Sequence, residues 1–132
     1  MKLSPIAKVV ALGGAILGIG VAVGVLTGIV AWGHAELVES NIKNGQVFAL
    51  GDAPTQVQLT FSEHLNAQRS AIYVVLLGPN TLADQGDLTV KEEQMTISLQ
   101  ERKPGIYQIR WIAVAEEDAG VSEGTITFSI KE

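Results

Sequence analysis

The sequence has no cysteine among its 132 residues and only two methionines, Met1 and Met95. This excludes disulfide bonds, thiolate metal sites and cysteine nucleophiles. It also excludes a thioether-rich site for Cu(I), which prefers soft sulfur ligands. Basic residues are scarce as well, with 9 Lys and Arg against 14 Asp and Glu. Because nucleic-acid binding needs basic clusters, nucleic acid is excluded as a partner. An acidic chain instead attracts cations.

Charge is also missing from a long apolar run, residues 9–32, which follows Lys2 and Lys8. A positive segment before an apolar run is typical of a secretory signal. This run is also long enough to span a bilayer, which takes about 20 residues as a helix. The positive end stays in the cytoplasm, so the rest of the chain is exported. We therefore expect an extracytoplasmic protein that contacts the membrane through residues 9–32 if this segment is retained.

The end of the apolar run resembles a cleavage site. Ala31 and Gly33 are small residues at the −3 and −1 positions expected by signal peptidase. We divide the chain into a signal peptide or membrane anchor, residues 1–33, and one domain, residues 34–132. That domain holds all 14 acidic residues and seven of the basic ones, which gives a net charge of −7. Its length suits a single core.

Residues 34–132 show the alternation of β-strands between frequent turns. In Gln56–Glu63, for example, Val57, Leu59 and Phe61 share one face and polar residues the other, as in a half-buried antiparallel strand. Strands are expected over residues 36–40, 56–63, 71–77, 88–90, 95–99, 106–115 and 124–131. We see no amphipathic helix in this part. The pattern predicts an all-β, Ig-like Greek-key β-sandwich of about seven strands, preceded by an N-terminal hydrophobic signal or anchor helix.

Several side chains of the predicted strands belong to the core by their parity. Tyr107, Ile109, Trp111 and Ala113 share one face of the long strand, and Ile126, Phe128 and Ile130 share one face of the last. We interpret these aromatic residues as packing groups. No arrangement of Ser, His and Asp indicates nucleophilic catalysis, and no glycine-rich phosphate loop follows a strand. We expect no enzyme activity.

The two histidines are the nitrogen ligands that the sequence offers. Cleavage after Gly33 would leave His34 with a free α-amine beside its imidazole, a pair that chelates Cu(II) readily. His64 follows Glu63 at a strand end, where parity places Glu63 at the rim of the core and His64 on the opposite side. His64 remains a candidate if the loop turns it towards His34. The acidic run Glu116–Asp118 is either a solvated loop or a source of one carboxylate ligand. Three adjacent residues cannot supply the 6–8 oxygens of a calcium site.

Taken in order, the motifs of the domain resemble the CopC copper-resistance family. They are His34-Ala35-Glu36-Leu37, Ser40 with Asn44-Gly45, Ala53-Pro54, Val57–Glu63, Pro104–Trp111 and Gly124–Phe128. The resemblance implies an Ig-like sandwich exported to the periplasm or cell surface. It also implies Cu(II) binding at the mature amino terminus and cooperation with a membrane protein of the CopD type.

The resemblance further implies a ligand set, which this sequence matches in part. The terminal histidine of the family corresponds to His34 and its carboxylate to Glu63. An Asp-x-His pair of the family falls on Asp118, or on Glu117 with a one-residue shift, but Gly120 stands where the histidine belongs. The candidate metal ligands are therefore His34, Glu63 and Asp118, with His64 as a possible replacement imidazole. The alternative is a metal-free sandwich that serves as a membrane-anchored interaction module.

Overall fold

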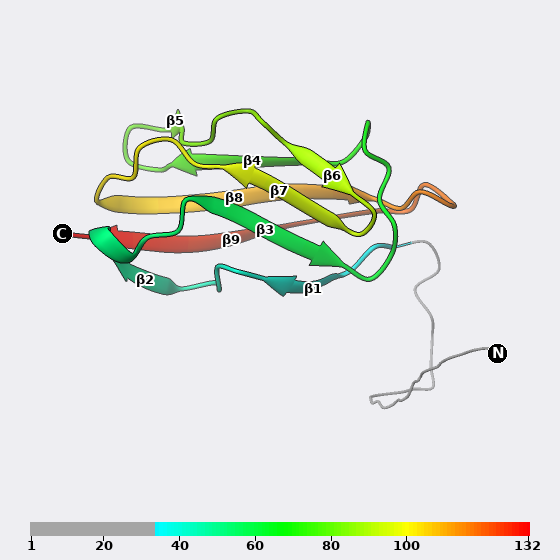
Figure 1. Ribbon diagram of the computed structural model, residues 1–132, viewed down its shortest axis with the longest axis horizontal. Helices are drawn as coiled ribbons and strands as arrows, with labels where there is room; N and C mark the ends of the chain where they lie inside the picture. Colours follow the sequence, from blue (N-terminus) through cyan, green and yellow to red (C-terminus); the bar gives the residue numbers. More distant parts are fainter. Residues whose placement is uncertain (1–33) are drawn as a thin grey trace, which may run out of the picture. The chain divides into compact units, whose positions relative to one another are not determined.

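The computed structural model describes residues 34–132, which form a sandwich of two β-sheets (Figure 1). The predicted leader, residues 1–33, lies outside the described residues. Within residues 34–132, the structure has no helix that is long and apolar enough to cross a membrane. The predicted all-β sandwich is confirmed for the described part of the chain.

The first sheet has four antiparallel strands. Its order is β1 (Leu37–Ser40), β3 (Gln56–Phe61), β7 (Gln94–Ser98) and β6 (Thr89–Lys91). The tight β6–β7 connection places Lys91 opposite Gln94. The central strand β3 pairs with both β1 and β7, so its end is held on two sides.

The second sheet has five strands. Its order is β2 (Gln46–Ala49), β9 (Val121–Lys131), β8 (Gly105–Val114), β4 (Ala71–Leu76) and β5 (Thr81–Leu82). A long hairpin, β8–β9, forms its centre. Strand β2 runs parallel to β9, whereas the other pairs are antiparallel. The short 3₁₀ turn η1 (Leu50–Asp52) follows β2 and leads back towards the first sheet.

The core lies between the sheets and is built from the side chains that alternation assigned to it. Phe61 is buried beside Trp111, with ring centroids 5.1 Å apart in an edge-on arrangement. Tyr107 stacks on Phe128 at 5.0 Å. Full burial of a large apolar side chain contributes roughly 1.5–3 kcal/mol, so these pairs supply much of the stability of a small sandwich.

The structure has nine strands in the described residues, where the sequence pattern predicted about seven. The two additional strands are β2 and β5, and β5 has only two residues, which is too short to show an alternating pattern. Strand β9 begins at Val121, three residues before the predicted start, because Val121 pairs with Val114 across the hairpin. The acidic β8–β9 loop spans residues 115–120.

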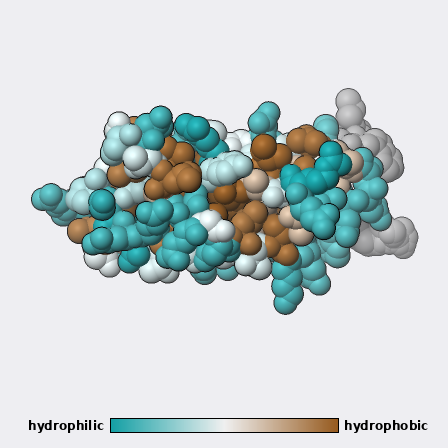
Figure 2. Space-filling view, turned by 90° about the horizontal axis from the view of Figure 1, so that it is seen from above, coloured by the Kyte–Doolittle hydropathy of each residue, from teal (hydrophilic) through white to brown (hydrophobic). Residues whose placement is uncertain are grey.

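One long edge of the sandwich, where β6 and β4–β5 lie, is seen from above in Figure 2. Apolar surface gathers in the middle of this edge and hydrophilic surface covers both ends. Buried Asp84 closes part of the β4 edge, because its carboxylate accepts hydrogen bonds from the N–H groups of Val74 (2.8 Å) and Gly86 (2.9 Å). Such a cover protects an exposed strand from pairing with another chain.

Candidate metal centre

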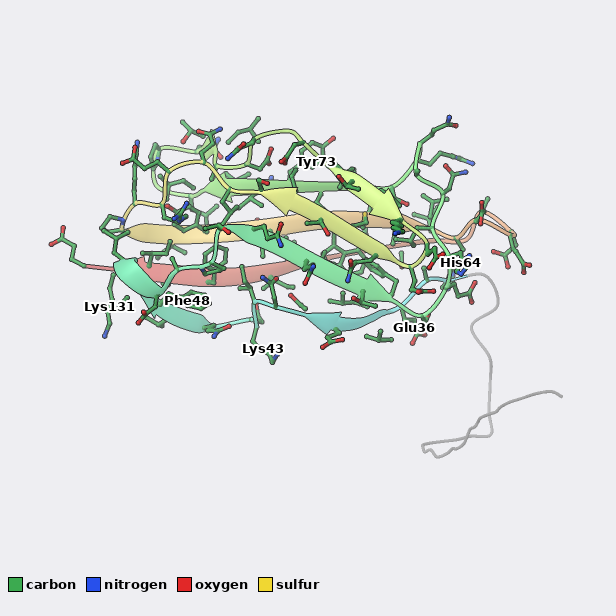
Figure 3. All side chains as sticks on the ribbon, in the orientation of Figure 1. Glu36, Lys43, Phe48, His64, Tyr73 and Lys131 are labelled. Atoms are coloured by element: carbon green, nitrogen blue, oxygen red, sulfur yellow. The ribbon has the colours of Figure 1, made fainter. Side chains whose placement is uncertain are left out.

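Four segments of the chain meet at one end of the sandwich. They are the entry to β1, the residues after β3, the β8–β9 loop and the β6–β7 turn. Backbone hydrogen bonds join them: Leu65 N–H donates to the Glu92 carbonyl (2.8 Å) and Glu116 N–H to the His64 carbonyl (2.9 Å). Figure 3 shows Glu36 and His64 at this end. We call it the acidic end, defined by Glu36, Glu63, Glu117 and Asp118.

The entry to β1 is fixed by hydrogen bonds to both sheets. Glu36 N–H donates to the Ser62 hydroxyl (2.9 Å), and Ser62 N–H donates to the Glu36 carbonyl (2.8 Å). From β9, the Ser122 hydroxyl donates to the Ala35 carbonyl. Ala35 itself has no exposed surface. His34 is exposed, but it directly precedes this anchored residue and is held at the acidic end.

Glu63 is the partly buried carboxyl group of the acidic end. Burial raises its pKa above the ordinary value, and the neighbouring charges of Asp118, Glu117 and Glu36 raise it further, whereas His34 lowers it. Loss of hydration and like charges both disfavour an ionised carboxyl group. Charges from two other segments, the entry to β1 and the β8–β9 loop, therefore act on one side chain, and a bound cation at this point would relieve the repulsion among the carboxyl groups.

The β8–β9 loop is closed by its own backbone. Ala115 N–H donates to the Gly120 carbonyl (2.9 Å), and Ala119 N–H donates to the Ala115 carbonyl (3.1 Å). The Asp118 carboxylate accepts a hydrogen bond from Gly120 N–H (3.3 Å). Gly120, which stands where the family pattern has histidine, thus contributes only backbone groups. Asp118 remains exposed, with one carboxylate oxygen in this turn.

His64 lies among other carboxylates than those around Glu63. Its Nε2 is 3.4 Å from Glu93 Oε2, and its Nδ1 is 4.0 Å from Glu116 Oε1, with 58% of the side chain exposed. The strand parity around β3 predicts this separation from Glu63. The two ring nitrogens face different carboxylates, so His64 bridges the β6–β7 turn and the β8–β9 loop.

The candidate ligands are neighbours, but they do not form a finished coordination shell. Among residues 34–132, no three His, Asp or Glu side chains lie close enough as they stand to hold a metal ion. In this arrangement the charge of Asp118 raises the pKa of Glu63 and the charge of His34 lowers it. Closure around an ion would require side-chain rotation, which is accessible to exposed groups on the nanosecond timescale.

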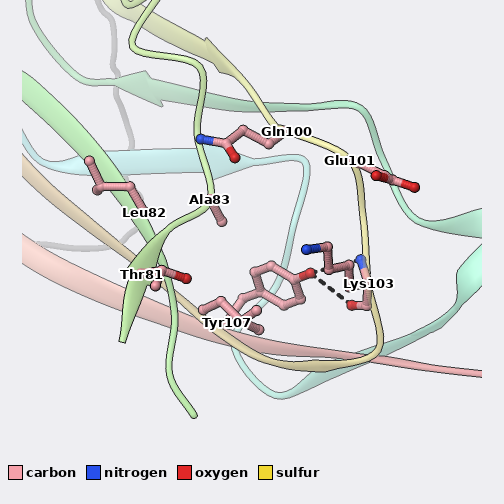
Figure 4. A pocket seen from close by; sticks show the side chains of 8 residues that line it. Thr81, Leu82, Ala83, Gln100, Glu101, Lys103 and Tyr107 are labelled. Carbon is pink, nitrogen blue, oxygen red and sulfur yellow. Dashed lines mark hydrogen bonds between the residues drawn. The ribbon is translucent and has the colours of Figure 1, made fainter. Parts of the chain in front are cut away.

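The opposite end of the sandwich has a small pocket of different chemistry (Figure 4). Its volume is about 150 Å³, and Tyr107 lies in it with its hydroxyl donating to the Lys103 carbonyl (2.7 Å) and accepting from Lys103 N–H (3.0 Å). The lining residues are Leu76, Thr81, Leu82, Ala83, Gln100, Glu101, Lys103 and Tyr107. None of them is a histidine or methionine, so this pocket lacks the nitrogen and sulfur ligands of copper.

Two residues of the acidic end were not among the ligand candidates suggested by the sequence. Glu36 adds negative charge near Glu63, and its position two residues after His34 was the available signal. Ser122 bonds to Ala35. It has the same strand parity as the inward-facing Ile126 and Phe128, so it is a polar residue in a place where alternation predicts an apolar one.

Comparisons with known proteins agree with the fold and the motifs. The family model described as CopC domain matches residues 37–131. PcoC, a methionine-rich copper resistance protein from Escherichia coli, is 28% identical with a TM-score of 0.61, over 74% of this chain and 99% of PcoC. CopC from Methylosinus trichosporium OB3b is 21% identical with a TM-score of 0.61, over 74% of this chain and 94% of that one, a likeness of fold.

A comparison with curated protein sequences returns no match. The family assignment therefore rests on the domain model, which covers nearly all of the described residues, and on the agreement of the sandwich with the solved structures. The predicted resemblance to the CopC family is confirmed by these findings over residues 37–131. The chain belongs to the CopC domain family.

Proposed function

We propose that residues 34–132 form an exported copper-resistance domain that binds Cu(II) at its amino terminus. Membership of the CopC domain family supports this, as does the likeness to PcoC, whose description names it a copper resistance protein. The acidic net charge of the domain and the nitrogen donors of His34 favour a divalent cation with affinity for nitrogen.

One observation carries the proposal: hydrogen bonds hold both the segment after His34 and the loop that carries Asp118 against the residues that follow β3. There the charge of Asp118 raises the pKa of Glu63 and that of His34 lowers it. These are the three positions that match the ligand pattern of the family. Like-charged carboxyl groups that converge in this way repel one another, and a bound cation would relieve that repulsion.

Each residue has a defined role in this proposal. After cleavage at Gly33, the α-amine and imidazole of His34 supply two nitrogen ligands, which select Cu(II). The carboxylates of Glu63 and Asp118 supply oxygen ligands and neutralise the charge of the ion. Since Gly120 replaces a second imidazole, binding is weaker than at a site with two histidines. His64, which lies between Glu93 and Glu116, stays outside this ligand set.

The test compares two forms of the domain that differ only at the α-amine. The domain beginning at His34 and the same domain with an acetylated His34 α-amine are titrated with Cu(II) by calorimetry. Acetylation converts the amine into an amide and leaves no free amine beside the imidazole, so we expect the first form to bind one ion and the second to lose that binding. Equal affinities in the two proteins would contradict the proposal.

We extend the proposal to location and partner. The positive segment and apolar run of residues 1–33 support export, and the family resemblance supports delivery of copper to a membrane protein of the CopD type. Cross-linking in intact cells, with a photoreactive residue placed at Glu117 in the exposed loop, should capture such a membrane protein. A matched probe at Glu101, at the opposite end, is the control.

A second function is favoured by one specific observation. Gly120 stands where the family pattern has a histidine, which removes one nitrogen ligand. This fits a sandwich that has lost its metal and acts as an interaction module anchored by residues 9–32. The intact mass of the protein from its native envelope separates the two functions, because a chain retaining residues 1–33 cannot present the His34 amine.

A further inference from the structure

Ser122 breaks the pattern of the strand that carries it. In β9 the even-numbered residues face inward, and Ile126, Phe128 and Ile130 are buried. Ser122 has the same parity and is partly buried, yet it is polar. A buried hydroxyl group is costly unless it has a hydrogen-bond partner. Its partner is the Ala35 carbonyl, 87 residues away in the sequence.

The bond ties the amino-terminal segment to the second sheet. On the other side, Ser62 holds Glu36 to the end of β3 in the first sheet. The entering chain is thus clamped between both sheets, directly after His34. Consecutive Cα atoms are about 3.8 Å apart, so fixing Ala35 confines His34 to a small volume at the acidic end.

We propose that Ser122 is a positioning residue for copper, holding the Ala35 carbonyl so that the amine and imidazole of His34 stay beside Glu63 and Asp118. This inference rests on the proposed function. Ser122 does not touch the ion. It lowers the conformational entropy that the terminal residue loses when it binds, which is how preorganisation raises affinity.

The two serine clamps differ in what they fix, which makes Ser122 the informative one. Ser62 accepts from and donates to Glu36 as part of the β1–β3 pairing, so its bonds mainly continue the sheet. Ser122 reaches across to the other sheet and bonds the carbonyl group nearest to His34. Its loss should loosen the terminus while the sheets remain paired.

The experiment uses the domain beginning at His34 with three substitutions. Ser122→Ala should weaken Cu(II) binding by up to about tenfold in calorimetry, because the loosened terminus then loses more conformational entropy when it binds the ion. Ser122→Thr keeps a hydroxyl group and should restore binding. Ser129→Ala, on the same strand near its other end, is the matched control and should bind as the original domain does.

Two further readouts separate positioning from general damage. The electron paramagnetic resonance spectrum of bound Cu(II) should change in Ser122→Ala, and the copper-free variant should show faster motion of residues 34–36 in ¹⁵N relaxation while β8 and β9 remain rigid. With the His34 α-amine acetylated, Ser122→Ala should no longer affect the residual copper binding, since the chelating amine is already blocked.

The outcomes distinguish this inference from the proposed function. If the domain beginning at His34 binds no Cu(II), the proposed function fails and the role of Ser122 fails with it. If that domain binds Cu(II) and Ser122→Ala matches it in affinity and spectrum, only the role of Ser122 is overturned.

Discussion

Folding shifts the pKa values of two carboxyl groups, which lie at opposite ends of the sandwich, in opposite directions. At the acidic end, burial and the negative charges of Asp118, Glu117 and Glu36 raise the pKa of Glu63. At the other end, before β6, hydrogen bonds from the Ser98 hydroxyl and backbone N–H lower the pKa of Asp87; the N–H bond is 2.8 Å long. The Asp87 carboxylate holds the end of β7 through these hydrogen bonds. The Glu63 carboxyl group instead has mainly like-charged neighbours.

The comparison of the two ends indicates which one is the better candidate for a binding site. Both ends consist of turns and loops between strands of the same two sheets, and the same core lies beneath them. At one end the Tyr107 hydroxyl both donates to and accepts from the Lys103 backbone. At the acidic end Asp118, Glu117 and Glu36 raise the pKa of Glu63, and perturbed pKa values of this kind are frequent at functional sites.

The largest effect is expected from the core beneath the acidic end. Trp111 is 8% exposed and packs edge-on against Phe61, which directly precedes Ser62 and Glu63. Trp111→Ala should lower the free energy of unfolding by about 3–5 kcal/mol, because it removes a large buried side chain and leaves a cavity. Urea unfolding measures this, and a loss under about 1 kcal/mol would show that Trp111 is not a packing residue.

The same aromatic ring explains a glycine requirement. A Cβ atom built on Gly124 would lie 2.5 Å from Cζ2 of Trp111, which is closer than packed atoms allow. The indole ring therefore lies directly on the β9 backbone at this point.

An intermediate effect is expected on copper affinity. Asp118→Asn keeps an oxygen that accepts from Gly120 N–H, so the loop should hold its shape while one negative charge is lost. Cu(II) affinity should fall at least about tenfold, a usual cost of altering a metal site. Calorimetry measures it. Glu101→Gln removes a charge at the opposite end and should leave the affinity unchanged; equal losses in both variants would mean that only net charge matters.

The smallest effect sharpens the contrast between the two carboxyl groups. Because folding raises the pKa of Glu63, its contribution to stability is full below about pH 4.5, the ordinary value, and is lost as the pH rises through the folded-state pKa. Glu63→Gln should therefore stabilise the copper-free domain at pH 7, by less than about 1 kcal/mol since the group is partly solvated.

Asp87 gives the opposite sign in the same measurement. Its pKa is lowered in the folded state, so its contribution is present above the ordinary value of 3.8 and disappears as the pH falls through the folded-state pKa. Asp87→Asn should destabilise the domain at pH 7 and have little effect in strong acid. Chemical unfolding at pH 3 to 8 tests both variants; changes of the same sign would remove the contrast between the ends.

The sequence by itself determined the layers of this protein. Alternation assigned Val57, Leu59 and Phe61 to the core, because strand geometry points successive side chains to opposite faces. It also placed His64 on the other side from Glu63. It missed β5, with two residues, and the parallel pairing of β2 with β9, because a local pattern does not specify which strand lies next to which.

The tertiary structure decided which chain segments share an end. The order of strands in the two sheets brings His34, Glu63 and Asp118 to one end of the sandwich. His64 lies at the same end, but its ring nitrogens are near Glu93 and Glu116. The tertiary structure also joins Ser122 by a hydrogen bond to Ala35, which lies 87 residues earlier in the sequence. Side-chain periodicity is a property of each strand alone, whereas these meetings depend on how nine strands pack around a common core, which no short stretch of sequence contains.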